Sequence, residues 1–178
     1  DLVIMGSHGD MGYRDFFIGS NAYYTIKRAA CPVLLIPEQN KWSEFRKILF
    51  PVRPTLFSSK LFDVICELTR HNTQKCMLQL LGVVPGELKN TISILSKTVQ
   101  EAKKQYNKEK FDIALSNGKS NDIAEYVLQR SKAINADLVV ISQGLDLPSN
   151  PFFIGPFSQR IINHAKTPVL SLVRTSYN

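Results

Sequence analysis

Little in this 178-residue sequence could cross-link the chain or hold it in a membrane. Its three cysteines, Cys31, Cys66 and Cys76, form no Cys-x-x-Cys pair, which argues against a disulfide framework or a zinc site and is typical of a reducing cytoplasm. No apolar run approaches the roughly 18 residues that a membrane-spanning helix requires. We therefore expect free thiols that are buried or half-buried, a cytoplasmic location, no metal site and no membrane partner.

The N-terminus lacks the basic stretch and the small-residue cleavage site of a signal peptide. Asp1 stands inside an apolar run, where a natural chain would start with Met, and this predicts a fragment of a longer polypeptide. Hydrophobic residues make up 44% of the sequence, which is the content of a globular protein and not of a disordered one.

Basic residues are in excess, with a net charge of +7 and a pI near 9.4. Such an excess is compatible with nucleic acid or with anionic metabolites as partners. The densest basic run alternates with Glu101 and Glu109 and carries no aromatic stripe; it consists of Lys103, Lys104, Lys108 and Lys110. This mixture is typical of a solvated helix face, so we expect no nucleic-acid partner.

The sequence contains an internal repeat. Residues 1–37 align with residues 137–173 at a constant shift of 136, without a gap, and 13 of the 37 positions are identical. The identities include Phe-Phe-Ile-Gly at 16–19 and 152–155, and Pro-Val-Leu at 32–34 and 168–170. Both segments should therefore form the same structural piece. The second copy is preceded by the 91 residues from Arg46 to Ala136, and this predicts that about 90 residues are missing upstream of Asp1.

Apolar periodicity predicts alternating strands and helices after residue 45. Strands are expected at 47–52, 77–84, 111–116, 137–142 and 168–173, and helices within 59–70, 91–107, 123–134 and 155–165. The third of these helices should be capped by Ser120 or Asn121. Apolar strands separated by helices indicate right-handed βαβ units and a parallel sheet that is buried on both faces.

The predicted fold class is α/β, a five-stranded parallel doubly wound (Rossmann-like) sheet with a partial second copy of the same unit. We expect residues 1–37 to be the C-terminal part of a first, truncated domain and residues 46–175 a complete second domain. Residues 38–45 would be the linker, with Trp42 and Phe45 packing it down. Two strands and a helix are too few to bury a core, so residues 1–37 should be covered by another part of the protein.

The first copy also contains a candidate phosphate loop. Gly6 ends a buried strand and Gly9 lies in the loop that follows; neither has a Cβ, so the backbone can approach a ligand. Gly19 opens the next helix, whose free N–H groups and positive dipole end suit phosphate, while Ser20 and Asn21 can add side-chain donors. Both segments follow the carboxyl ends of strands, where parallel sheets bind ligands. On spacing alone these residues could equally be turn glycines and a helix cap, and His8 a surface residue.

Taken together, residues 1–9, Gly19-Ser20 and residues 31–36 resemble the C-terminal half of a universal stress protein domain. ATP-binding members of that family carry Gly-x2-Gly-x9-Gly-(Ser/Thr), and residues 6–20 fit the motif without deviation. The resemblance implies that ATP or a related adenine nucleotide binds here, through Gly6, Ser7, His8, Gly9, Gly19, Ser20 and Asn21. It also implies that the fifth strands, near Val33–Ile36 and Val169–Val173, pair across a pseudo-twofold axis; otherwise a second chain would cover the first copy.

The second copy departs from the motif. Ser142 replaces the first glycine, Leu145 the second, and Pro156 the serine, although Gly155 remains. The first strand ends in Arg53, where the family's ATP-binding members have an Asp. We therefore expect a degenerate second site, formed by Arg53, Ser142, Gly144, Gly155 and Pro156.

Two functions follow as hypotheses. The first is a stress-response protein that binds an adenine nucleotide through its first unit and uses the second for dimerisation or regulation, as a homodimer or an intramolecular pseudo-dimer. The alternative is a structural or interaction module that binds no nucleotide. An enzyme is not predicted, because the sequence has no Walker loop, no nucleophile elbow and no metal-ligand cluster. Slow ATP hydrolysis is compatible with the sequence, although no catalytic residue can be named for it.

Overall fold

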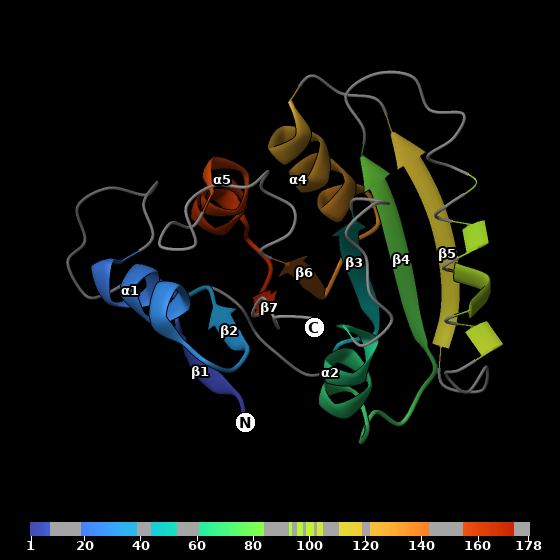
Figure 1. Ribbon diagram of the computed structural model, residues 1–178, viewed down its shortest axis with the longest axis horizontal. Helices are drawn as coiled ribbons and strands as arrows, with labels where there is room; N and C mark the ends of the chain where they lie inside the picture. The colour runs from blue at the N-terminus through green and yellow to red at the C-terminus, as the bar shows by residue number, and fades with distance from the viewer. Residues whose placement is uncertain are drawn as a thin grey trace.

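The strands in the described part of the protein form one seven-stranded sheet, in the order β1-β2-β7-β6-β3-β4-β5 (Figure 1). The structure, a computed structural model, describes residues 1–7, 19–38, 44–52, 61–83, 93, 96–97, 99–101, 103–104, 111–118, 122–142 and 155–172. The strands are β1 (Val3–Gly6), β2 (Val33–Ile36), β3 (Lys47–Val52), β4 (Cys76–Val83), β5 (Phe111–Gly118), β6 (Leu138–Ser142) and β7 (Val169–Leu172). The helices are α1 (Ser20–Arg28), α2 (Leu61–Leu68), α4 (Ile123–Ala133) and α5 (Pro156–His164). The described residues between 93 and 104 are also helical.

Strands β5, β4, β3, β6 and β7 pair in parallel, which confirms the predicted doubly wound sheet. The chain moves outward from β3 to β4 and β5, and then crosses back to β6 and β7 on the other side of β3. The strand order therefore reverses between β3 and β6. In open α/β sheets, ligands bind at the carboxyl ends of the strands beside such a reversal.

The central strands are buried on both faces, as their unbroken apolar sequences predicted. Because side chains alternate along a strand, Leu138 and Val140 join the core on one face, and Val139 and Ile141 join the core on the other. Helix α2 packs on the first face through Phe62 and Ile65. Helices α1, α4 and α5 cover the second face (Figure 1).

The two repeat copies have the same local geometry. Tyr23 N–H donates to Gly19 O and Gln159 N–H to Gly155 O, at 3.0 and 2.9 Å, and these two bonds differ by the repeat shift of 136. The registers of β1 on β2 and of β6 on β7 differ by the same shift, with Val3 opposite Val33 and Val139 opposite Val169. The described residues of the two segments therefore share these hydrogen bonds and this register, while the interpretation of the segments as two copies of one domain stays a prediction. The division into domains at residues 37 and 46 stays a prediction, because the sheet is continuous across it.

The pairing of β2 with β7 is antiparallel and joins the two copies. Leu34 lies opposite Leu170, and these two residues are also repeat equivalents, so a pseudo-twofold axis passes through this pair. The expected pairing of the fifth strands is thus confirmed. Both leucines are buried, with 1% and 0% of their surface exposed. Strand β2 is therefore covered, as expected, by the same sheet and core as the rest of the chain, whereas the expectation that Ile4 is covered is wrong, because it is 59% exposed on the edge strand β1.

Two sequence expectations about element ends need correction. The residue that caps α4 is Asp122, whose carboxylate accepts the Glu125 N–H at 3.1 Å, and not Ser120 or Asn121. Strand β5 continues two residues past Ser116, because Asn117 and Gly118 still pair with β4. Helix α2, Leu61–Leu68, lies within the range predicted for it, and a three-residue turn follows it. Of the predicted linker anchors, Phe45 is buried and Trp42 lies outside the described residues.

The pseudo-twofold contact predicts that Leu34 and Leu170 contribute more to the free energy of unfolding than the exposed Leu2 does. Replacing Leu34 or Leu170 with alanine should lower the free energy of unfolding by about 2–5 kcal/mol, because each substitution leaves a cavity in a closed core. Leu2→Ala is the matched control: Leu2 is 38% exposed beside the edge strand, so its loss should cost much less. Urea unfolding of the three variants measures the difference. Equal losses for Leu34→Ala and Leu2→Ala would contradict the role of the β2–β7 contact.

Candidate functional site

A backbone hydrogen bond brings the two halves of the phosphate-loop motif together. Gly19 N–H donates to Ser7 O at 3.0 Å, and Ser7 N–H donates to Ile36 O at 3.1 Å. The end of β1 and the start of α1, 12 positions apart in the sequence, are thereby fixed against each other and against β2. Gly6 is exposed, whereas Ser7 is only 4% exposed, so its side chain offers a ligand little surface.

The start of α1 is open to an anion. Its N-cap residue, Gly19, makes no side-chain cap hydrogen bond, and the first turn contains no acidic residue. Ser20 and Asn21 are exposed there. The φ of Gly19 is −56°, which any residue can adopt, so what the glycine provides is the absence of a side chain beside Ser7. The unneutralised N-terminal dipole and first-turn N–H groups could bind a phosphate.

Helix α4 shows the opposite arrangement. The Asp122 carboxylate caps it and is paired with Arg160 of α5 at 2.7 Å, and Glu125 lies in the first turn. The hydrogen bond from the Glu125 backbone N–H, followed by those from Arg160, holds the pKa of Asp122 below its usual value. The dipole of α4 is thus already compensated by carboxylates of the chain, while the first turn of α1 contains no acidic residue.

In the second copy, the geometry of the helix start is kept and its chemistry is changed. Gly155 caps α5 with φ −64° and ψ 159°, close to the values of −56° and 144° at Gly19. Pro156 follows it at the first helical position, where it keeps the helix geometry but has no N–H to offer a phosphate. Ser142 is half-buried at the end of β6, at the strand reversal.

The structure thus brings together Gly6, Ser7, Gly19, Ser20 and Asn21 of the first predicted site, at the end of β1. It places Ser142, Gly155 and Pro156 at the end of β6 and the start of α5. His8 and Gly9 of the first site, and Arg53, Gly144 and Leu145 of the second, lie outside the described residues. Because β2 runs antiparallel to β7, the carboxyl ends of β1 and β6 point in opposite directions. The two helix starts therefore lie at opposite ends of the strands.

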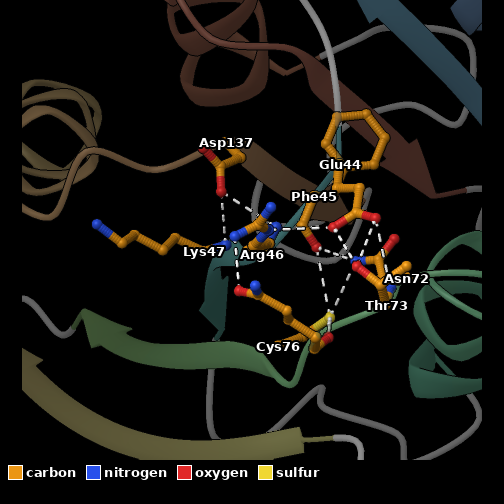
Figure 2. Close-up of polar contacts among 9 residues, drawn as sticks. Glu44, Phe45, Arg46, Lys47, Asn72, Thr73, Cys76 and Asp137 are labelled. Carbon is orange, nitrogen blue, oxygen red and sulfur yellow. Dashed lines mark hydrogen bonds and ion pairs between the residues drawn. The ribbon is translucent and has the colours of Figure 1, made fainter.

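Sequence reasoning missed a polar cluster at the amino ends of β3, β4 and β6 (Figure 2). The Asp137 carboxylate accepts the backbone N–H groups of Arg46 and Lys47, at 3.0 and 2.8 Å. The Arg46 side chain donates to Glu44 at 3.1 Å and to Gln74 at 2.6 Å. The only sequence signal was the identity of Asp1 and Asp137 in the repeat alignment.

The same cluster ties the turn before β4 to the segment before β3. Thr73 donates to Glu44 through its backbone N–H and its hydroxyl, and the Asn72 amide donates to Phe45 O at 2.7 Å. The hydrogen bond from the Thr73 backbone, and then those from its hydroxyl and from Arg46, lower the pKa of Glu44. Burial raises the pKa of the Cys76 thiol, which donates to Phe45 O. These groups satisfy one another's hydrogen bonds. The cluster, which we call the clasp, therefore fixes the segment before β3 against the turn before β4.

Other features of the described residues lie away from the predicted site. A groove of about 700 Å³ runs between α4 and α5, lined by charges of both signs such as Glu125, Lys132 and Arg160, and it contains none of the predicted site residues. Within the described ranges, no group of three or more His, Cys, Asp or Glu side chains could hold a metal ion. None of the helices in that part of the chain has the length and apolarity needed to cross a membrane. The cysteines are free, with Cys76 buried and the other two half-buried, as predicted.

Comparison with known proteins points to one family. Residues 1–37, which contain the intact motif, match the profile of the universal stress protein family. A universal stress protein from Archaeoglobus fulgidus has the same fold, with a TM-score of 0.67 and 16% identity over 98% of this chain and 61% of its own. A protein of Pseudomonas aeruginosa UCBPP-PA14 assigned to the same family gives a TM-score of 0.64 and 18% identity, over 97% of this chain and 63% of its own.

The resemblance to universal stress proteins is confirmed. The family profile covers the first 37 residues, and at these identities the solved structures show the fold. A further universal stress protein, solved in complex with cAMP, gives a TM-score of 0.58 and 16% identity over 75% of this chain and the whole of its own. Comparison with curated proteins gives no match. The chain spans less than two thirds of the Archaeoglobus and Pseudomonas proteins.

The lowered pKa of Glu44 predicts a pH-dependent contribution to stability. A carboxyl whose pKa is depressed by folding stabilises the protein above its unfolded-state pKa, and this stabilisation disappears as the pH falls through the folded-state pKa. Glu44→Gln should therefore lower the Tm at pH 7, and the difference from the unmodified protein should vanish in acid. Glu101→Gln, at an exposed helical position, is the control for loss of one negative charge. A Tm difference that is constant from pH 7 to pH 3 would contradict the assignment.

Proposed function

We propose that this chain is a nucleotide-binding universal stress protein in which the phosphates of an adenine nucleotide bind at the start of α1. The observation that carries the proposal is the Gly19 N–H to Ser7 O hydrogen bond, which assembles the motif at a helix start without a capping side chain. The family profile over residues 1–37 supports it, and so does the relative solved with cAMP. Gly6, Gly19, Ser20 and Asn21 would lie around the phosphates, with His8 and Gly9 contributed by the intervening loop.

In this proposal the second unit, residues 46–175, has lost nucleotide binding and serves dimerisation or regulation. Pro156 removes an N–H that Ser20 supplies, and Leu145 puts a side chain where Gly9 leaves space. Each lost charge-assisted hydrogen bond to phosphate costs about 1.5–3 kcal/mol. Arg53 could attract an anion, but one cation does not replace the backbone donors. The β2–β7 pairing is the intramolecular pseudo-dimer contact through which the second unit would act.

A second candidate function is an interaction module without a nucleotide. It is favoured by the near-complete burial of Ser7 and by the position of β1 at the sheet edge, with no described strand beside it to complete a cleft. Both candidates are binding proteins of the cytoplasm and not enzymes. The two are distinguished by whether phosphate-dependent binding can be measured at the start of α1.

The first experiment maps ATP binding onto the two helix starts of the 178-residue chain. In an amide NMR titration to millimolar ATP, the resonances of Ser20, Asn21 and Ala22 should shift, and adenosine should shift them much less because it has no phosphates. Phe157 and Ser158, at the equivalent positions of α5, serve as the internal control and should stay unchanged. Equal shifts with adenosine, or none at α1, would favour the module that binds no nucleotide.

The second experiment removes one donor without disturbing the helix. Ser20→Pro should weaken ATP binding at least tenfold, because the ring replaces the amide hydrogen. The fold should survive, since α5 begins with Pro156 at the same position with nearly the same N-cap geometry. Ser20→Ala, which keeps the N–H and loses only the hydroxyl, is the matched control and should bind better than Ser20→Pro. Unchanged affinity in Ser20→Pro would place the nucleotide elsewhere.

Gly19→Asp tests the charge of the site. A carboxylate at the N-cap would supply the anion that α1 lacks, as Asp122 does for α4, and would repel phosphate. We expect the variant to be at least as stable as the unmodified protein, while ATP binding is abolished. Thermal unfolding and the same titration measure the two effects. Binding that persists in a folded Gly19→Asp variant would contradict the proposed position of the phosphates.

A further inference from the structure

The groove between α4 and α5 has the size of a ligand site. The two helices lie side by side (Figure 1), and the groove between them has a volume of about 700 Å³. Pockets for small organic ligands typically have volumes of roughly 300–1,000 Å³. None of the described residues of the two predicted phosphate sites lines this groove. It extends instead to Asp137 and Thr167, which lie just before β6 and β7.

Part of the lining is apolar. Leu128 of α4, together with Ala136 and Ala165 after the two helices, lines the groove, and all three are half-buried. The backbone donors of the two alanines are used within the fold: Ala136 N–H donates to Ser131 O at 2.9 Å and Ala165 N–H to Ile161 O at 2.8 Å. This part of the groove therefore suits the uncharged body of a ligand.

The acidic side chains that line the groove already have partners. Glu125, in the first turn of α4, lies 3.9 Å from Arg160, and Arg160 also pairs with Asp122 at 2.7 Å. The Asp137 carboxylate accepts the two backbone N–H groups of the clasp, at 3.0 and 2.8 Å (Figure 2). Hydrogen bonds and opposite charges thus offset much of the negative charge in the lining.

Two lysines lie where α4 and α5 end. Lys132 is in the last turn of α4 and Lys166 follows α5, and both line the groove and are exposed. Among the described residues, neither lysine forms an ion pair with a carboxylate. Cations at helix ends also offset the helix dipole, but at exposed positions this effect is small and leaves the ammonium groups able to contact a ligand.

The repeat shows that the lysine after α5 is not needed to end the helix. Ala165 is identical to its repeat equivalent, Ala29, and the N–H of each donates to the carbonyl four residues earlier at 2.8 Å. The next residue is Lys166 after α5 and Ala30 after α1, and both are exposed. The two helices therefore end in the same way, and the positive charge is an addition of the second copy.

We propose that the groove between α4 and α5 binds a small organic anion. The carboxylate or phosphate of this ligand contacts Lys132 and Lys166, and its uncharged body lies along Leu128, Ala136 and Ala165. An anion is favoured over a cation because the carboxylates of the lining are engaged and the two lysines are not. The volume favours a small molecule. This inference does not rest on nucleotide binding at the start of α1.

Amide NMR titration of the 178-residue chain tests the groove directly. Millimolar benzoate and phenyl phosphate are the probes for a carboxylate and a phosphate, and phenol is the uncharged control. The amides of Leu128, Lys132 and Thr167 should shift with at least one of the two anions, and the stronger response identifies the preferred anionic group. Equal shifts with phenol, or none with either anion, would overturn the proposal. Ser20 and Asn21 report separately on the nucleotide site, so failure at one site is distinguishable from failure at the other.

Removing the two lysines tests the charge. Lys132→Gln combined with Lys166→Gln should weaken binding of the preferred anion by about tenfold or more, because charge-assisted hydrogen bonds are lost. The Tm should stay nearly unchanged, since both side chains are exposed. Lys103→Gln is the matched control and should bind as the unmodified protein does: Lys103 is exposed on a helix whose Val99 packs against the other face of the sheet. Unchanged affinity in the double variant would overturn the proposal.

An acidic peptide separates a small ligand from a protein partner. Tetraglutamate carries the same anionic groups on a peptide chain, and we expect it to bind the groove no more tightly than benzoate or phenyl phosphate does. Much tighter binding of tetraglutamate, lost in the double lysine variant, would show that an acidic protein segment occupies the groove and would overturn the assignment to a small molecule.

Discussion

The antiparallel contact between β2 and β7 is the interaction on which the rest of the architecture depends. It places repeat equivalents Leu34 and Leu170 opposite each other and merges two sets of parallel strands into one sheet. The described part of residues 1–37 forms two strands and one helix, which could not bury Val33, Leu34 and Leu35 without this contact. Helix α1 is thereby held on the same face of the sheet as α4 and α5.

The direction of that contact also separates the two helix starts. A parallel contact would have placed Gly19 and Gly155 at one edge of the sheet, where a single ligand or a shared loop could couple them. The antiparallel contact places them at opposite ends of the strands, so a phosphate at either helix start would be bound by residues of that copy alone. The proposed loss of phosphate binding at Pro156 would therefore leave the start of α1 unchanged.

The two copies show how fold and ligand chemistry can be separated. Both begin their helix after an extended glycine, and both repeat the same backbone hydrogen bonds. Proline at the first helical position satisfies the helix as well as serine does, because that N–H has no partner within the helix. The same N–H is the group that a phosphate would use. Under the proposed function, substitution at this position would leave the helix in place and remove a donor to phosphate.

The sequence by itself determined the strands and helices from β3 onward, the repeat, and the loop residues, because these depend on local periodicity, on turn residues and on direct comparison of two segments. The resemblance to a family supplied the expectation that the fifth strands pair. Only the tertiary structure decided the register at Leu34 and Leu170, the burial of Ser7, and the clasp in which Asp137 holds Arg46 and Lys47. It also showed that Arg160, 38 residues away, donates to the carboxylate of Asp122, which caps α4. Such contacts join residues far apart in the chain, and a local pattern carries no information about which distant partner will lie beside it.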